Sequence, residues 1–383
     1  MLLDKNISII VFKLNNTTFE QMGELGQFTS LIWPDAFSGY ANFELWTPIN
    51  EDSAELIREG NVLWTGGENA GVIEIVKQTV DKNGKKTYNV KGRTLEKYLT
   101  DRIVWGTFIG SGYTSTIIYG LVDDNLINPV KKKRKIPWLE LAPDTHIGQR
   151  ISQYQKTGGE VYDAVQALAS NSDIGFNVLF DPRNKKLIFE VRAGTDRTEN
   201  NLNGNEPVVF STELEDILSS SYYMNNQDEK TIAFVQGEDT GDNRKSVIVG
   251  DDEAVGFDRK ELYVDARDLQ SEVHHDDGTT TKLTDEEYID TLAQRGDEKL
   301  SEYPATETFE AQIRQFGDVQ YEYGIDYFKG DKVTVIDEEL GVSVSARITQ
   351  VEEDFSEEYA LVLTFGYSYP TTLQKVKRMM NIT

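Results

Sequence analysis

Short runs in which apolar and polar residues alternate dominate both ends of the chain. In the last third, three such runs begin at Tyr321, Val342 and Tyr359, and each ends at a cluster of Gly, Asp or Glu residues. A period of two places successive side chains on opposite faces, which is typical of half-buried antiparallel strands. The first two runs are separated by a turn predicted at 337–341.

The first hundred residues show the same pattern. An Asn-Gly pair at 83–84 predicts a hairpin turn over 81–84, because this pair readily adopts positive φ. Pro34 and Gly39 are expected to break the apolar stretch 24–46 into two strands around a connection. Further strands are predicted at 7–14, 62–64, 72–80 and 88–91, with short helices at 53–59 and 93–102.

The middle of the chain switches between helical and strand periods. The best helical spacing is that of Val161, Ala164, Val165 and Leu168, within a helix predicted at 160–169. Thr284 and Glu287 form a capping box that opens a helix to about residue 303. A helix at 115–127, a hairpin of 176–180 and 186–191, strands at 214–223, 231–236 and 261–266, and a polar loop at 238–256 complete the pattern.

Composition narrows the class of protein. The 383 residues predict two to four domains, with 38% hydrophobic and 27% charged residues. The chain has no cysteine, which excludes disulfides, thiolate zinc sites and thiol nucleophiles. No stretch is apolar enough to span a membrane, and the start lacks the features of a signal peptide. We therefore expect synthesis in a cytoplasm.

The formal net charge is −26, which disfavours binding to nucleic acid over the general surface. Solubility is one explanation, and a negative wall past which DNA slides without binding is another. The one basic block, Lys131–Lys-Lys-Arg–Lys135, opposes this charge. Three interpretations of the block stay open: a solvated loop, a contact to an acidic protein surface such as a second subunit, or a contact to DNA.

No catalytic, cofactor-binding or metal-binding residue is assigned. His274, His275, Asp276 and Asp277 form a cluster of ligand types, but adjacent residues on an extended loop point to opposite sides, and His146 stands alone. Paired acids are too numerous for one pair to be singled out. The acids Asp239, Asp242, Asp251 and Asp252 do not match a calcium loop of the EF-hand type, and no phosphate-binding loop or nucleophile motif is present.

The tryptophans Trp33, Trp46, Trp64, Trp105 and Trp138 all lie in the first 138 residues. Most are expected in the core, and one or two at subunit contacts.

Three segments together resemble one known family. The first segment contains the motif "V-x-G-R-x-L-x-x-Y-L-x-x-R-I-V" at 90–104, and the helix at 284–303 contains "Y-I-x-x-L-x-x-R-G". The last segment, 305–373, contains "G-D-x-V-x-V", "A-R-I-T-x-V" and "L-x-x-T-F-G". These motifs are similar to those of hub proteins of phage tail tips and baseplates, the tail-associated proteins. By family wording alone, Arg347 and Asp331 are candidates for buried pairs. The segments that resemble the family are about 1–104, 284–303 and 305–373, and together they cover more than half of the chain.

The resemblance implies a β-rich α+β fold with two barrel-like tube domains and inserted α+β domains. The parts would be 1–105 (first barrel-like domain), 106–210 (inserted α+β domain), 211–304 (start of the second barrel, with polar loops and the helix) and 305–383 (C-terminal barrel strands and tail). The family implies a homotrimeric ring in the virion that closes the tail tube. Its partners would be the distal tail protein, the tape-measure protein and receptor-binding or fibre proteins, and DNA would pass through the lumen.

Family members with a C-terminal peptidoglycan hydrolase differ from this chain, which ends about ten residues after Leu373. We therefore expect no cell-wall cleavage by this polypeptide. Three alternatives stay open: a hub of a contractile phage-like bacteriocin or injection system, a protein that binds or cleaves cell-wall glycans, and a plain β-rich binding module.

Overall fold

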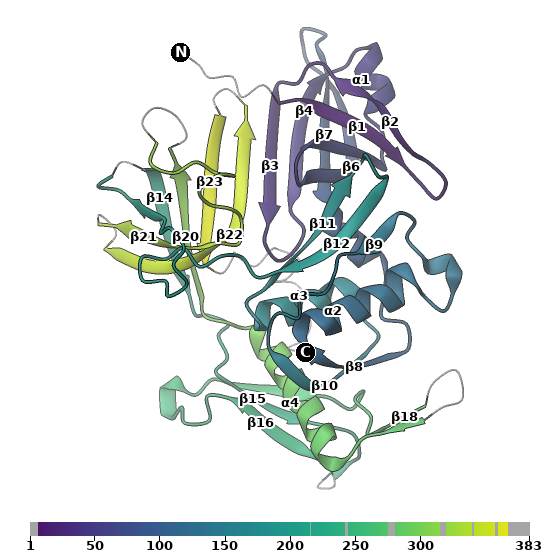
Figure 1. The fold of residues 1–383 in the computed structure, drawn as a ribbon, viewed down its shortest axis with the longest axis vertical. Coiled ribbons are helices and arrows are strands. Elements are labelled where there is room, and N and C mark those ends of the chain that lie inside the picture. Colours follow the sequence, from purple (N-terminus) through teal and green to yellow (C-terminus); the bar gives the residue numbers. More distant parts are fainter. Residues whose placement is uncertain are drawn as a thin grey trace.

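The computed structural model describes residues 7–214, 216–241, 244–274, 280–314, 319–338, 341–356 and 359–366. Its main feature is a 13-stranded sheet with the central order β14-β20-β23-β22-β3-β4-β7-β6-β5-β1-β2. In Figure 1 this sheet occupies the upper half, with the last strands of the chain on the left and the first strands on the right. The β-rich α+β class predicted from the sequence is confirmed.

The first strands pack around a dense aromatic core. Trp33 stacks on Phe43 with ring centroids 4.9 Å apart, and both side chains are buried. The predicted hairpin turn is present, since Gly84 has φ +80° and donates to the Asp81 carbonyl at 3.0 Å. The elements are β1 (Ile9–Leu14), β2 (Phe19–Leu25), β3 (Ser30–Ala36), β4 (Asn42–Pro48), α1 (Glu51–Leu56), β5 (Asn61–Gly66), β6 (Asn69–Val80) and β7 (Lys86–Thr94).

The last strands join the first ones directly. Residues 350–354 of β22 pair antiparallel with residues 32–36 of β3, so one backbone ladder links segments more than 300 residues apart. The strands of this part are β13 (Val209–Ser211), β14 (Ile217–Asn225), β20 (Thr306–Ile313), β21 (Lys332–Asp337), β22 (Val342–Phe355) and β23 (Tyr359–Gly366). A second apolar core lies between them, with Phe365, Leu363 and Val335 fully buried.

The middle segment packs helices against short strands below the sheet. The predicted 3-4-7 spacing in α3 holds, because Val161, Val165 and Leu168 are buried against the same core. Its elements are η1 (Leu95–Asp101), β8 (Thr107–Tyr113), α2 (Thr114–Val122), η2 (Asp123–Ile127), η3 (Lys132–Arg134), β9 (Leu139–Leu141), β10 (Arg150–Thr157), α3 (Val161–Asn171), β11 (Gly175–Asp181) and β12 (Lys186–Arg192).

A further small unit lies at the bottom of Figure 1. Its sheet has the order β16-β15-β17, and one face is covered by α4, with Leu292 buried among Ala233 and Val235. The elements are β15 (Ile232–Gln236), β16 (Ser246–Gly250), η5 (Gly256–Asp258), β17 (Glu261–Asp265), β18 (Glu272–His274), β19 (Thr280–Lys282) and α4 (Asp285–Ser301).

The capping box of α4 is confirmed. The Thr284 amide donates to the Glu287 carboxylate at 2.7 Å, and the Glu287 amide donates to the Thr284 hydroxyl at 3.3 Å. Replacing Thr284 by alanine is therefore expected to lower the free energy of unfolding by about 1 kcal/mol. Urea denaturation measures this change. The matched control is Glu286→Gln in the same exposed turn, which should shift stability by less than about 0.5 kcal/mol. Equal losses in both variants would contradict the capping role.

Three local predictions are wrong. The alternating run from Tyr321 becomes a strand only at Lys332, because Gly324 and Gly330 take positive φ and turn the chain. Pro34 lies inside β3 rather than in the connection, which leaves Gly39 as the break. The segment 238–256 contains β16, a five-residue strand completed by pairing with β15. The short helix expected at 93–102 is confirmed, and it is the 3-10 helix η1. The predicted tail motif after residue 366 and residues 339–340 of the turn at 337–341 lie outside the described residues.

Within the described residues, no helix combines the length and the apolar composition needed to cross a membrane.

Candidate functional site

The two histidines that the structure describes, His146 and His274, do not form a ligand site. His146 takes positive φ (56°) on an exposed loop, and its Nδ1 lies 3.0 Å from the Asp144 carboxylate. His274 ends β18, whereas His275, Asp276 and Asp277 lie outside the described residues. In the part of the chain that the structure describes, no group of three or more His, Asp or Glu side chains could hold a metal ion.

The acids considered for calcium lie apart. Asp239 follows the end of β15, and Asp251 follows the end of β16. Because these two five-residue strands pair antiparallel in one ladder, the two acids lie at opposite ends of it. Such a ladder spans about 14 Å at ~3.4 Å per residue. Asp252 instead accepts a hydrogen bond from Arg259 at 3.4 Å, and Asp242 is outside the described residues.

Asp331 is buried and Arg347 is partly buried, yet they do not pair with each other. Arg347 makes two hydrogen bonds to the carboxylate of Asp173 in the middle segment, at 2.8 and 2.7 Å, and also donates to backbone carbonyls of Ala193 and Gly330. Asp331 accepts from Arg197 at 2.9 Å and from two backbone amides. The two residues therefore tie the last strands to the segment 193–197 by separate routes.

The Asp173 carboxylate should lose its ion pairs with Arg347 and Lys332 when it becomes protonated at low pH. Burial would raise its pKa, but hydrogen bonds and charge from Arg347 and Lys332 outweigh burial and hold the pKa below its ordinary value. A depressed pKa means that the folded state is stabilised above the ordinary Asp pKa of about 3.9 and loses this contribution as pH falls through the lower folded value.

We expect Asp173→Asn to cost about 1 kcal/mol at pH 7 and nothing near pH 2, because protonation then removes the same charge from the native protein. Asparagine tolerates the positive φ of this position (52°), so backbone strain does not confound the comparison. Urea unfolding at pH 7, 4 and 2 measures the difference. A penalty that is the same at all three values would contradict the charge explanation.

The junction between the first and last strands contains a buried polar cluster. Lys329, only 3% exposed, binds the carboxylate of Asp35 on β3 and lies 3.8 Å from Glu68 in the turn after β5. Glu68 also accepts from Arg192, at the end of β12, at 3.0 Å and from Asn177 at 3.0 Å. Burial alone would raise the pKa of Glu68, but the charges of Arg192 and Lys329 outweigh burial and hold the pKa below its ordinary value, so the carboxylate is ionised.

Two more carboxylates border this cluster. Glu96 is fully buried, accepts from the Val178 amide at 2.9 Å, and has a pKa raised by burial and by the nearby Asp35 charge. Glu353 on β22 accepts from Asn69 at 3.1 Å and from the Tyr359 hydroxyl at 2.8 Å. Every element that meets at the β3–β22 ladder thus contributes a charged or polar side chain, which fixes their relative positions.

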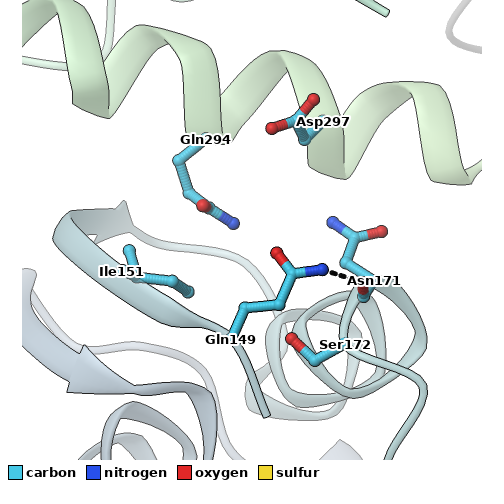
Figure 2. A pocket seen from close by; sticks show the side chains of 6 residues that line it. All are labelled: Gln149, Ile151, Asn171, Ser172, Gln294 and Asp297. Carbon is cyan, nitrogen blue, oxygen red and sulfur yellow. Dashed lines mark hydrogen bonds between the residues drawn. The ribbon is translucent and has the colours of Figure 1, made fainter.

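A small polar cleft separates α4 from the middle segment. Its volume is about 330 Å³, and its lining side chains are Gln149, Ile151, Asn171, Ser172, Gln294 and Asp297. Figure 2 shows Gln294 and Asp297 on the helix facing the other residues across the opening, where Gln149 donates to the Asn171 carbonyl at 3.1 Å. The cleft combines amides with one carboxylate and lacks a paired acid and base, so it offers no evident catalytic arrangement.

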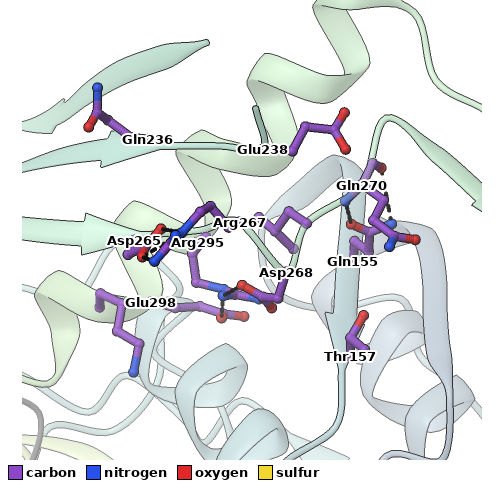
Figure 3. Close-up of polar contacts among 12 residues, drawn as sticks. Gln155, Thr157, Gln236, Glu238, Asp265, Arg267, Asp268, Gln270, Arg295 and Glu298 are labelled. Carbon is purple, nitrogen blue, oxygen red and sulfur yellow. Dashed lines mark hydrogen bonds and ion pairs between the residues drawn. The ribbon is translucent and has the colours of Figure 1, made fainter. Parts of the chain in front are cut away.

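Beside the cleft, an ion pair lies within the α4 unit and an amide side chain attaches this unit to β10. Arg295 on α4 makes two hydrogen bonds of 3.0 Å to Asp268, and Gln155 on β10 exchanges contacts with the backbone of Gln270 (Figure 3). Arg295 also lies 3.9 Å from Glu298. Burial and the Glu298 charge raise the pKa of the neighbouring Tyr154. Arg295 is satisfied by Asp268 through its terminal nitrogens, whereas Arg295 Nε and Glu298 Oε1 are buried without a hydrogen-bond partner among the described residues.

The basic block forms an ordered exposed surface. Lys131 places its Nζ 4.0 Å from the ring centroid of Trp105, and the Arg134 guanidinium lies 5.0 Å from the same ring. Trp105 is 50% exposed, and Val130 beside the block is 92% exposed. Among the described residues, no ion pair joins the lysines of the block to a carboxylate.

The other tryptophans are less available. Trp33 is buried, Trp46 and Trp138 donate through their indole N–H groups to Glu44 and to the Asn15 carbonyl, and Trp64 packs on Phe12 and Phe180. The prediction that one or two tryptophans contribute to subunit contacts therefore points to Trp105. Sequence could not select it, because its two cationic neighbours lie 26 and 29 positions away.

Solved structures of phage tail proteins have the same fold over almost their whole length. Three examples are the 43 kDa tail protein of prophage MuSo2 from Shewanella oneidensis (14% identity, TM-score 0.54, 94% of this chain and 97% of that one), the prophage tail protein gp18 from Listeria monocytogenes EGD-e (12%, 0.53, 98% and 99%) and the tail protein from Neisseria meningitidis MC58 (13%, 0.52, 94% and 97%). At these identities the likeness establishes the fold.

A comparison with curated proteins gives no match. The family model described as Siphovirus ReqiPepy6 Gp37-like protein matches residues 11–367. The match begins within β1 and covers every later element through β23, and it confirms the resemblance to a phage tail protein family that the sequence predicts.

Proposed function

The chain belongs to the Siphovirus ReqiPepy6 Gp37-like family, and on this premise we propose that it is a structural hub of a phage tail tip or baseplate. Three copies form a ring that closes the distal end of the tail tube. The ring opens to release the tape-measure protein and DNA during infection. The chain performs this role in the virion as a structural component, without a reaction of its own.

The ladder between β3 and β22 is the observation that carries this proposal. It holds two groups of strands side by side within one sheet, so a single subunit supplies two wall segments. Three subunits then supply six segments, which matches the sixfold symmetry expected of a tail tube. The likeness to solved tail proteins over more than nine-tenths of the chain supports the same assignment.

Partners follow from the same position in the tail. The distal tail protein lies above the ring, receptor-binding or fibre proteins lie beside or below it, and the tape-measure protein ends within it. The net charge of −26 supports a lumen through which DNA passes without specific binding, since like charges repel.

Two measurements test the proposal. Sedimentation or mass photometry of the purified protein should give three times the chain mass of 43.4 kDa. Antibody-gold labelling of tailed particles from the producing strain should mark the distal tail tip, with particles lacking the protein as control. A tail left unlabelled while soluble extract contains abundant protein would overturn the proposal and favour a glycan-active protein.

A further inference from the structure

The surface around Trp105 is built for a partner. We define the basic patch as Trp105, Val130, Lys131, Lys132 and Lys133, all of which are exposed. The two apolar side chains stand among three cations in a chain of net charge −26. Exposed apolar side chains framed by charge are typical of protein contact sites.

The basic patch is held in place before any partner arrives. Arg134 donates to the Ile103 carbonyl at 2.6 Å, and Arg102 donates to the Arg134 carbonyl at 2.7 Å. The Trp105 amide donates to Asn125 at 3.0 Å. Because these bonds fix the loop against the segment 102–105, little conformational entropy is lost on binding.

A surface of opposite charge is present elsewhere on the same chain. We define the acidic loop as residues 251–258, which joins β16 to β17 and carries Asp251, Asp252, Glu253, Val255, Phe257 and Asp258, all exposed. Phe257 is fully exposed (102%) and Val255 is 75% exposed. The loop is also held in place by Thr231. The Thr231 hydroxyl donates to the Asp258 carbonyl, and the Asp251 amide donates to the Thr231 carbonyl.

The two surfaces are complementary and lie on different sides of the molecule. In Figure 1 the turn η3 of the basic patch is at the right-hand side, and the turn η5 of the acidic loop is at the left-hand side. Two patches at opposite sides of one molecule can contact each other only between copies. Repeating such a head-to-tail contact generates a ring when the rotation closes.

We propose that the basic patch of one copy binds the acidic loop of the next. Trp105 and Val130 contact Val255 and Phe257 at the centre, and the lysines face the carboxylates around them. The contact between copies is independent of the proposed hub function, whereas closure at three copies rests on it.

The absence of native cysteine allows a direct test by disulfide cross-linking. Val130→Cys and Phe257→Cys variants are purified separately, mixed, and oxidised. The proposal expects a covalent dimer in the mixture and at most a trace in either variant alone. The matched control replaces Phe257→Cys by Leu202→Cys, which is equally exposed (99%) but lies outside both surfaces.

Charge reversal tests the electrostatic part. Adding Lys131→Glu, Lys132→Glu and Lys133→Glu to the Val130→Cys variant should lower the cross-linked yield about tenfold, which corresponds to about 1.4 kcal/mol. Adding Asp251→Lys, Asp252→Lys and Glu253→Lys to the Phe257→Cys partner should restore it. Circular dichroism of each variant shows that the fold is retained.

The outcomes separate this inference from the proposed function. If a Val130→Cys/Phe257→Cys double variant cross-links into species of at most three chains, the result supports both the contact and the trimeric ring. Cross-linked species of more than three chains would support the contact but overturn the ring. A trimer by mass without 130–257 cross-links overturns the contact and leaves the hub. An alternative outcome is that the protein binds a duplex DNA oligonucleotide through the basic patch, in which case the triple Lys→Glu variant loses this binding. If that is observed and no 130–257 cross-link forms, a phosphate-bearing partner replaces the proposed one.

Discussion

Lys329→Met is expected to lower the free energy of unfolding by about 3–5 kcal/mol at pH 7. The side chain is 3% exposed, and its ammonium group is the cation between Asp35 and Glu68. Methionine fills a similar volume but leaves the Asp35 carboxylate, itself only 13% exposed, without this counter-charge. Breaking a buried pair by removal of one partner costs far more than loss of a surface pair, because the remaining charge stays desolvated.

Urea unfolding followed by tryptophan fluorescence measures this loss. The matched control is Lys186→Met, which removes the same group from the exposed pair with Glu140 and should cost less than about 1 kcal/mol. The penalty at Lys329 should shrink as pH falls below about 4, because the Glu68 carboxylate, whose pKa is held below its ordinary value, then becomes protonated. Similar penalties for the two lysines would show that the junction does not depend on this cation.

Gly92→Ala is expected to cost about 3 kcal/mol through a steric clash rather than through charge. Gly92 lies in β7, and an added Cβ would stand 1.9 Å from the Val72 carbonyl oxygen and 2.6 Å from the Phe43 ring. The Phe43 ring cannot retreat, because Trp33 stacks on its other side. The carbonyl cannot move without breaking the β6–β7 ladder.

The control for this prediction is Gly26→Ala, since nothing lies within 4 Å of a Cβ at that position. It should change stability by less than about 0.5 kcal/mol. Urea midpoints and the near-ultraviolet dichroism of the buried tryptophan report the two variants. A mild effect at Gly92 would mean that β6 and β7 separate more easily than the packing indicates.

Gly92 also shows which features of the protein can be predicted from its sequence and which cannot. It is the glycine of the "V-x-G-R" wording at 90–93, so the resemblance selected a position whose physical role, close approach of Phe43, only the structure reveals. The capping box at Thr284 and the turn at Gly84 were predicted correctly, because both depend on neighbouring residues alone.

Contacts between distant segments escaped prediction. The strand β16 was assigned to a loop, since five residues carry too weak a pattern until β15 pairs with them. The middle-segment partners of Arg347 and Asp331 lie 134 to 174 residues away, and nothing in the local sequence selects them. The basic patch was recognised by its lysines, but Trp105 and the fixed backbone around it depend on the fold.

The ladder between β3 and β22 also bears on how the protein is made. During synthesis, β3 emerges early, whereas its partner residues 350–354 follow more than 300 residues later. At about 5–20 residues per second, the edge of β3 would wait roughly 15–60 s for its native neighbour. Unpaired edges invite wrong pairing, so the nascent chain passes through a period in which a host chaperone, or early docking of the middle segment, has to shield this strand.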